Sequence, residues 1–351
     1  MRVWDARAAR ITLTVAIVAA TLYGVYVIRR TLFVFLLAIF FAYMVYPLVV
    51  LLDRFRPRRA PPWASPVAAL VLVLALVVLI GILIGPSIGD EATRLSEQLP
   101  ALLQRGDAMA TERWPAFLQP YAGRIVAFAR TELQGGAAAA LPLAQRIGAG
   151  VLQVAGDLLL LVLIPILAFL FTLAGPEIRQ MVERSLARRA IDQSIVDDLD
   201  NLLGRYIRAL LLLSAAAFAA YAVVLASIGV PYALLLATIA ALLEFIPVFG
   251  PLLSALAIIL VAGLAGYPHL IWILIFIVGY RIFQDYVLGP RLMGTGVGVH
   301  PILVLFGLLA GAEVAGVPGI FLSVPAIAAV LIIGRHVLRA RAKSKDEKAS
   351  L

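Results

Sequence analysis

A series of apolar stretches, each long enough to cross a lipid bilayer, constrains the fold of this chain most strongly. A helix rises 1.5 Å per residue, so about 20 apolar residues cross a hydrocarbon core of ~30 Å. Because backbone polar groups find no water in lipid, such stretches are expected to be helices that satisfy their own hydrogen bonds. The uninterrupted stretches are Ile11–Ile28, Thr31–Leu52, Pro66–Gly85, Val151–Ala174, Tyr206–Ile228 and Leu270–Leu288.

Two further apolar segments, Tyr232–Ala262 and Pro301–Gly334, do not fit a plain helix. The first would be roughly 46 Å long as one helix, well beyond the hydrocarbon core, and the second is equally too long. Each is predicted to form two part-length helices, either as a discontinuous span or as a re-entrant hairpin. The hairpin form is preferred because it places the loop with Arg291 in the cytoplasm. The helix-breaking residues are Pro247, Gly250 and Pro251 in the first segment and Gly316, Pro318 and Gly319 in the second.

The predicted fold is an all-α, polytopic membrane protein with about eight membrane segments, two of them broken by Gly and Pro. The first two stretches are expected to form a membrane hairpin, with a cleaved signal peptide as the alternative for Ile11–Ile28. Residues 86–150 mix charges, prolines and apolar positions, which indicates an amphipathic, extracytoplasmic helical insert with segments such as Glu91–Leu103 and Ala122–Leu133. The predicted divisions are 1–85 (three spans), 86–150 (insert), 151–205 (fourth span and polar cytoplasmic segment), 206–335 (transport core) and 336–351 (basic cytoplasmic tail).

The composition supports a membrane location and argues against other classes of function. The chain is 63% hydrophobic and 14% charged, whereas soluble domains have ~25% charged residues. The net charge of +9 comes from basic clusters that follow apolar runs, as at Arg54–Arg59 and Arg335–Lys348. Such clusters mark cytoplasmic flanks, so we expect a membrane protein with both termini in the cytoplasm and no role in nucleic-acid binding.

Motifs for catalysis are missing from the sequence. There is no cysteine, the three histidines are far apart, and no nucleotide-binding or hydrolase motif occurs. We therefore expect no enzyme activity, no cofactor and no metal. Four acids lie close together at Asp192–Asp200, but without metal-site spacing they are interpreted as part of a solvated helix.

Charged residues inside the apolar second half mark the candidate transport pathway. A charge costs at least ~2.5–3.5 kcal/mol in the hydrocarbon core, so such residues should face the bundle interior or a water-filled path. Glu244 precedes the first break without a nearby cation in the sequence, which favours a proton- or cation-binding role. Arg281 and Asp285 share a helix face with Gln284 beside them, and a purely structural ion pair is the alternative there. Glu313 precedes the second break, and His300 before Pro301 is a capping or hinge candidate, with proton relay as its alternative.

A full span followed by a broken segment occurs twice in the second half, at Tyr206–Ala262 and at Leu270–Gly334. Matching broken segments in two halves indicate the binding site in secondary transporters, because the breaks expose helix ends and free backbone groups. The alternative is that these prolines and glycines are tolerated kinks.

Several strings in this region resemble the autoinducer-2 exporter family of transporters. They are YIRALLL from Tyr206, GVPYALLLATIAALLEFIPVFGPLLS from Gly229, QDYVLGPRLMGTGVGVHPILVLFGLLAG from Gln284 and AGVPGIFLSVPAIAAVL from Ala315. The resemblance is specific over roughly residues 195–335 and generic over 11–175. It implies a secondary transporter of the bacterial inner membrane, either one that exports a small polar solute such as autoinducer-2 or one that exchanges Na⁺ or Li⁺ for protons. It also implies a homo-oligomer, with a pentamer as one form.

The chain departs from the commoner pattern of that family at two places that alter charge near the presumed pathway. Gln284-Asp285-Tyr286 stands where many members have Glu-Gly-Asn, and Glu244-Phe245 stands where many have Asn before Ile-Pro. An acid at residue 244 tilts the expectation toward cation or proton coupling. A membrane scaffold that uses residues 86–150 to bind a partner is the alternative function. An intramembrane enzyme has less support, because no catalytic constellation lies at helical spacing.

Overall fold

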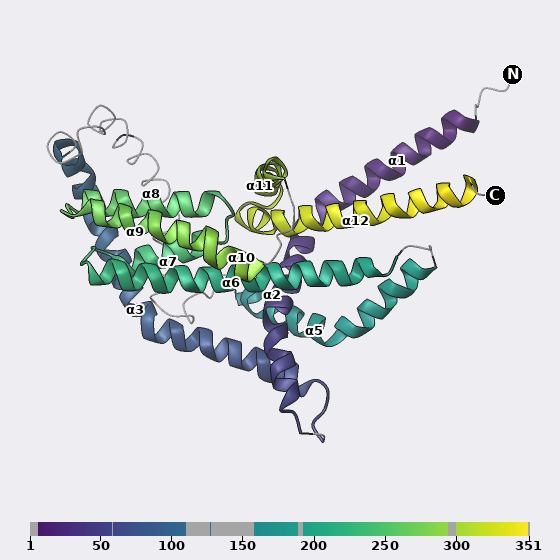
Figure 1. The fold of residues 1–351 in the computed structure, drawn as a ribbon, viewed down its shortest axis with the longest axis horizontal. Helices are drawn as coiled ribbons and strands as arrows, with labels where there is room; N and C mark the ends of the chain where they lie inside the picture. Colours follow the sequence, from purple (N-terminus) through teal and green to yellow (C-terminus); the bar gives the residue numbers. More distant parts are fainter. Residues whose placement is uncertain are drawn as a thin grey trace. The chain divides into compact units, whose positions relative to one another are not determined.

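The computed structural model describes residues 6–57, 59–109, 127, 158–188, 192–293 and 300–349, and these residues contain helices and no strand. This confirms the all-α prediction. The helices, labelled in Figure 1, are α1 (Ala6–Val27), α2 (Arg29–Arg54), α3 (Ala64–Met109), α5 (Leu158–Ala187), α6 (Ser194–Ser227), α7 (Ala233–Leu243), α8 (Phe249–Leu264), α9 (Leu270–Phe283), the π-helix η4 (Gln284–Leu288), α10 (Gly289–Met293), α11 (Pro301–Ala315) and α12 (Val317–Ala349).

Six stretches within these helices are long and apolar enough to cross a membrane, so the protein is a multi-pass membrane protein. The helices α1 and α12 differ from the sequence-based expectation. The described apolar part of α1, Thr12–Val27, is shorter than a full span, whereas α12 contains a full-length apolar stretch where a half-length helix was expected. The six are Thr31–Arg54, Ala64–Leu102, Leu163–Ala187, Ser194–Ser227, Leu270–Leu292 and Gly319–His336.

The junction between α1 and α2 lacks the turn that a hairpin needs. The amide of Ile28 donates to the carbonyl of Gly24 at 3.0 Å, and the amide of Leu32 donates to the carbonyl of Ile28 at 3.0 Å. Helical hydrogen bonding therefore continues through the junction, and α1 leaves α2 at an angle (Figure 1). The predicted hairpin is wrong at this point, because the continued helical hydrogen bonds leave no turn at Ile28 where the chain could reverse.

The chain forms two compact units, which are described separately. The first comprises Met1–Pro47, Leu159–Asp200 and Val299–Leu351, and the second comprises Leu48–Leu158 and Asn201–Gly298. Helices α11 and α12 therefore belong with α2 and α5, whereas the predicted transport core grouped them with the helices from α6 to α9. Both α2 and α6 contribute residues to both units.

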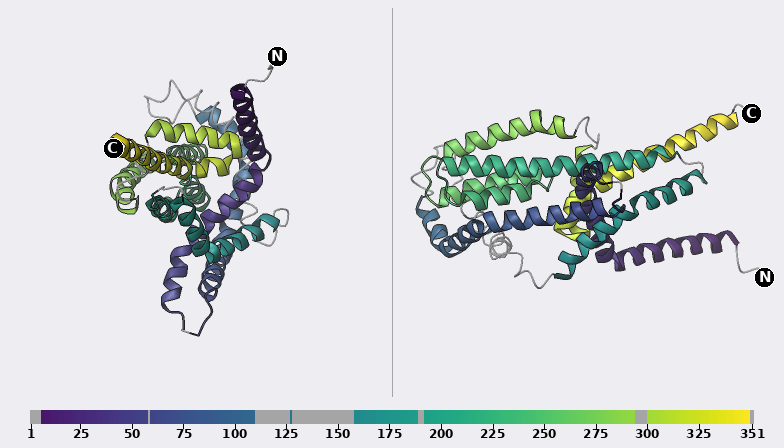
Figure 2. Two further views of the ribbon diagram at one scale, coloured as in Figure 1. Left: turned by 90° about the vertical axis from the view of Figure 1, so that its right-hand side faces the viewer. Right: turned by 90° about the horizontal axis from the view of Figure 1, so that it is seen from below.

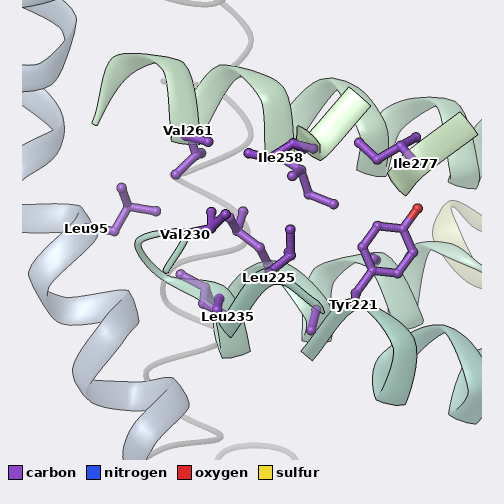
Figure 3. Close-up of a cluster of buried hydrophobic side chains, with 14 of the residues drawn as sticks. Leu95, Tyr221, Leu225, Val230, Leu235, Ile258, Val261 and Ile277 are labelled. Atoms are coloured by element: carbon purple, nitrogen blue, oxygen red, sulfur yellow. The ribbon is translucent and has the colours of Figure 1, made fainter. Parts of the chain in front are cut away.

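The core of the second unit lies between helices that run side by side, α6, α7, α8 and α9 (Figures 1 and 2). Leu225 of α6, Leu235 of α7, Ile258 of α8 and Ile273 of α9 are almost completely buried there, and Figure 3 shows the first three of these side chains meeting. Burial of such side chains stabilises a helical bundle mainly through close packing when the surroundings are lipid.

Helix α3 extends this core beyond the membrane stretch that the sequence indicated. It does not end at Pro86 but continues to Met109, with Pro86 and Pro100 inside it. Its buried residues Ile88, Ala92, Leu95 and Leu102 recur at helical spacing, and all four join the core of the second unit. The predicted amphipathic helix Glu91–Leu103 is therefore present as part of α3, and its apolar face packs against the core of the second unit.

The first turn of α7 depends on a side chain from α3. Tyr232, at the N-cap position of α7, has a left-handed backbone (φ 60°) and offers no side-chain cap. Glu91 takes this role from a distance of 144 residues, since its Oε2 accepts the amide of Leu235 at 2.8 Å. The hydroxyl of Tyr232 donates to Gln98 Oε1 at 2.8 Å, one further contact to α3. A carboxylate at a helix N-terminus also interacts favourably with the helix dipole.

In the first unit, α11 and α12 form a helical hairpin that turns at Gly316. This glycine has φ 65°, a left-handed conformation that favours glycine. A Cβ added at Gly311 would overlap the carbonyl of Gly319, and a Cβ at Gly319 would overlap the carbonyl of Gly311. Gly307 in turn faces Ser323 and Ile327, so the two arms run antiparallel at close range. The predicted break at GVPG is confirmed, and the chain reverses there.

We predict that Gly311→Ala destabilises the protein, because the new methyl group meets backbone that cannot move aside. Overpacking of this kind costs about 1–3 kcal/mol. The midpoint of thermal unfolding in detergent should fall by several degrees. The matched control is Gly334→Ala in α12, where an added Cβ meets no atom within 4 Å. Equal effects of the two substitutions would contradict the close approach of α11 and α12.

A second prediction concerns Glu91. Glu91→Ala leaves the amide of Leu235 without its acceptor, and loss of an N-terminal cap costs about 0.5–2 kcal/mol. The control is Glu97→Ala on an exposed position of the same helix, which should leave stability unchanged. Thermal unfolding of the two variants, measured side by side, checks this expectation. Unchanged stability of Glu91→Ala would mean that α7 does not need this carboxylate.

Candidate functional site

The break between α7 and α8 is a tight turn whose arms approach closely. Helix α7 ends at Leu243, and the amide of Ile246 donates to the carbonyl of Leu243 at 2.8 Å. The amide of Gly250 then donates to the carbonyl of Ile246 at 2.8 Å. Gly250 is buried, and a Cβ there would overlap the carbonyl of Leu243, so only glycine fits. The predicted break in EFIPVFGP is confirmed, and the chain turns back on itself.

The two prolines of this break have separate roles. Pro247 lies in the turn, where its fixed backbone ends the helical path of α7. Pro251 lies in the first turn of α8, where a missing N–H costs nothing because the first amides of a helix have no intrahelical partner. Between them Val248 has φ 69°, an unfavourable backbone conformation for a β-branched residue. The turn is therefore strained at its exposed tip.

Glu244 occupies the C-cap position of α7, at the start of this turn. Its side chain is half-buried, and its Oε1 accepts a hydrogen bond from Nε2 of Gln284, a residue that is only 4% exposed. The carboxylate stands at the end of α7 that carries the negative pole of the helix dipole, so both features attract positive charge. The structure thus joins two predicted pathway residues that lie 40 positions apart.

Gln284 is held by a π-helical turn that the sequence analysis did not predict. Helix α9 widens into η4 at Gln284–Leu288, where the amide of Gly289 donates to the carbonyl of Gln284, five residues back. Pro290 explains the widening, since its ring lacks an N–H and would clash with the carbonyl of Tyr286 in a regular helix. Single π-turns of this kind occur frequently at functional sites.

Arg281 and Asp285 form the predicted ion pair, with Arg281 Nε 2.9 Å from Asp285 Oδ2. Their side chains are 41% and 47% exposed, so in water such a pair would contribute little to stability. Both residues nevertheless lie close enough to Glu244 to act on its charge. The pair therefore places one positive and one negative group beside the carboxylate.

Two tyrosines complete the site, and the sequence analysis missed both. The rings of Tyr221 on α6 and Tyr280 on α9 pack edge to face with centroids 5.3 Å apart. Tyr221 stands at the edge of the apolar cluster in Figure 3 and interacts with Ser254 of α8. The hydroxyl of Tyr280 is buried and has no hydrogen-bond partner among the described residues. Tyr280 lies four residues before Gln284, so helical spacing places the two on one face.

The remaining predicted residues lie in the first unit. His300 caps α11, since its Nδ1 accepts the amide of Ile302 at 3.3 Å, which confirms the capping role. Gly316 and Gly319 belong to the turn between α11 and α12, and Pro318 follows the first residue of α12. Glu313 is exposed on α11 and makes no hydrogen bond or ion pair within the described part of the chain. Glu313 belongs to the first unit, whereas Glu244 belongs to the second.

The same described residues hold no group of three His, Cys, Asp or Glu side chains arranged to bind a metal. The acids around Asp197 instead contact basic and aromatic side chains, as described below. What the Glu244 site offers is a carboxylate, an amide, two phenol groups and a serine hydroxyl within an apolar bundle. Such a set can bind a proton, a monovalent cation or the hydroxyl groups of a small solute.

Comparison with known proteins identifies the family of this chain. The family model described as AI-2E family transporter matches residues 15–339. The chain belongs to this family. The match includes every residue of the Glu244 site and both broken segments. It also includes the described helices, apart from the first residues of α1 and the last residues of α12.

Individual relatives of the AI-2E family align over parts of their length. YrrI of Bacillus subtilis is 32% identical over 41% of each chain, and MT0215 of Mycobacterium tuberculosis is 33% identical over 36% of this chain and 35% of its own. YueF of Bacillus subtilis is 25% identical over 52% of this chain and 50% of its own. Each carries the name "Putative transport protein". This chain thus aligns with about half or less of the length of these relatives.

We predict that Gln284 and Glu244 are energetically coupled. Gln284→Leu removes the one side-chain donor that Glu244 has among the described residues and leaves a half-buried carboxylate unsatisfied, at a cost of about 1–3 kcal/mol. In a Glu244→Leu background the same substitution should cost much less. A double-mutant cycle on thermal unfolding measures this difference, with Gln193→Leu at an exposed position as the control. Additive effects of the two substitutions would contradict the contact.

Proposed function

We propose that this protein is an ion-coupled secondary transporter and that Glu244 takes up and releases a proton or a monovalent cation during each cycle. The observation that carries the proposal is the position of Glu244: a half-buried carboxylate at the tip of a broken helical hairpin, bonded to Gln284 from a π-turn. Family membership supports transport as the general activity. The sequence contains no nucleotide-binding motif, so an ion or solute gradient would supply the driving force.

The surroundings of Glu244 favour a carboxylate that can exchange a bound proton for a cation. A carboxylate permanently bonded to an arginine would be neutralised, but Arg281 is already paired with Asp285. Within the part of the chain that the structure describes, the direct side-chain partner of Glu244 is therefore a neutral amide. Exchange of a proton for a cation would then require only a small shift of Gln284 or of the strained turn at Val248.

Two kinds of transported cargo fit the polar groups of the site. In the first, Na⁺ or Li⁺ is exchanged for protons at the carboxylate itself. In the second, proton movement at Glu244 drives the export of a small polar solute of the autoinducer-2 type, whose hydroxyl groups would bind Tyr221, Tyr280 and Gln284. The unpartnered hydroxyl of Tyr280 favours a ligand that accepts or donates a hydrogen bond there.

The test uses the full chain reconstituted in liposomes. Vesicles with an imposed pH gradient are assayed for Na⁺ or Li⁺ exchange and, separately, for release of a loaded autoinducer-2-type solute. Glu244→Gln should lower flux about tenfold or more, since a tenfold effect needs only ~1.4 kcal/mol. Asp285→Asn should lower the flux less, because the charge of Asp285 acts on Glu244 without direct contact. Glu97→Gln, on an exposed position of α3, is the control and should keep wild-type flux.

Flux that survives both substitutions with unchanged pH dependence would overturn the coupling role of Glu244. No flux of any cargo in the wild-type protein, together with an intact complex in the membrane, would instead favour the scaffold alternative. The two outcomes are distinct, because the first requires a transporting wild-type protein and the second excludes one.

A further inference from the structure

A second polar cluster lies in the first unit, outside the Glu244 site, and joins the start of α6 to three other helices. Arg179 of α5 contacts Asp200 at 3.0 Å, Asp197, and Glu183 of its own helix at 2.8 Å. The hydroxyl of Tyr43 on α2 donates to Asp200 as well. Arg179 therefore neutralises the acids on one side of α6, and it keeps its charge at every physiological pH.

The third contact to this end of α6 comes from His336 on α12. The imidazole is only 6% exposed, although α12 carries it among exposed residues such as Arg335 and Leu338. Its Nε2 lies 2.9 Å from Asp198 Oδ2, and its Nδ1 lies 3.9 Å from Asp192 Oδ2. Both ring nitrogens thus face a carboxylate oxygen.

The two carboxylates determine what each form of the imidazole can bind. Ionised carboxylates only accept hydrogen bonds, so Nε2 must carry a proton to donate to Asp198, whereas Asp192 at 3.9 Å is attracted only by a positive charge on the ring. A neutral imidazole has a single N–H and can donate to one of them. Asp198 has no other basic partner within the described residues, whereas Asp197 and Asp200 share Arg179. The charged and titratable groups of this junction fall into two sets. The carboxylates of Asp192 and Asp198 face His336, while Arg335 on α12 is exposed. A separate set of side chains is held together by contacts to Arg179 and Asp200; it comprises Arg179, Glu183, Asp197, Asp200 and Tyr43.

We propose that His336 is a proton-dependent latch that holds the α11–α12 hairpin to the start of α6. With a proton on both ring nitrogens, the latch binds Asp198 and attracts Asp192. Loss of one proton removes the positive charge, so the ring keeps a single N–H for Asp198, no longer attracts Asp192, and holds α12 less tightly. Histidine is the side chain whose charge can change within the physiological pH range, so the latch is tested on both sides of neutrality.

The direction of the response follows from the charge. The latch is closed while the ring is protonated, and it opens as the pH rises and the ring loses its charge. In the predicted orientation this end of α6 and the C-terminus lie in the cytoplasm, so cytoplasmic pH is the signal. Helix α6 continues without interruption from Asp198 to Ser227 and carries Tyr221 of the Glu244 site, which gives the latch a continuous path to the transport core. The effect on flux rests on the proposed transport function, whereas the latch itself does not.

The first experiment measures the latch without transport. The chain contains no cysteine, so single cysteines at the exposed positions Gln193 and Leu338 carry spin labels without further changes. Distances between the labels are measured in nanodiscs at pH 6 and pH 8.5. The wild-type chain should show one narrow distance distribution at pH 6 and a broader, longer one at pH 8.5, with the ratio of latched to released molecules changing ~10-fold.

Variants assign this response to His336. His336→Gln keeps a hydrogen-bonding side chain but cannot gain charge, so the labels should report the released state at both pH values. Asp198→Asn should do the same, and it tests the latch even if changes at the buried residue 336 impair folding. His269→Gln, at an exposed histidine of the second unit, is the matched control and should follow the wild-type chain. Wild-type distances that do not change with pH, or a pH response that persists in both His336→Gln and Asp198→Asn, would overturn the latch.

The second experiment links the latch to flux in the same liposomes as above. Wild-type flux should rise as the pH on the side of the termini rises, and His336→Gln should be fast at both pH values. If the wild-type chain moves no cargo while the label distances still respond through His336, the transport proposal fails and the latch stands. If flux is normal but the distances do not respond, the latch fails and transport stands.

Discussion

Unpaired backbone groups at the ends of part-length helices are the constraint on which this structure depends. A helix that stops inside an apolar environment exposes amides and carbonyls that water does not reach. Here side chains from other segments reach several of these groups. Glu91 accepts the amide of Leu235 at the start of α7, and the hydroxyl of Ser214 donates to Ala241 near its end at 2.8 Å. The hydroxyl of Tyr267 satisfies the carbonyl of Ile228 just after α6 at 2.8 Å.

Local patterns in the sequence were sufficient for the breaks and for the short-range contacts. Glycine and proline in EFIPVFGP and GVPG mark where helices stop, because their backbone preferences act within a few residues. The Arg281–Asp285 pair follows from helical spacing alone. The capping role of His300 could be proposed because the residue stands directly before Pro301.

The contacts that build the candidate site could not be predicted, since they join residues far apart in the chain. Glu244 meets Gln284 across 40 positions, and Asp198 meets His336 across 138. No spacing rule links such pairs, because their meeting depends on how whole helices pack. Proline is also an uncertain signal for a helix end: the predicted boundary at Pro86 is wrong, because α3 continues through this residue. The interpretation of Asp192–Asp200 as a solvated helix captured the helix and its partial exposure but missed its partners.

The π-turn at η4 has a consequence for the geometry of everything that follows it. It contains one residue more than a regular helical turn would hold between Phe283 and Gly289. One residue corresponds to about 100° of rotation around a helix axis. If this turn tightened to a regular α-helix, the segment after Leu288 would rotate by that angle and shift by one rise, while Tyr280 and Arg281 upstream kept their orientation. A single extra residue thus sets how α10 is rotated relative to Tyr280 and Arg281.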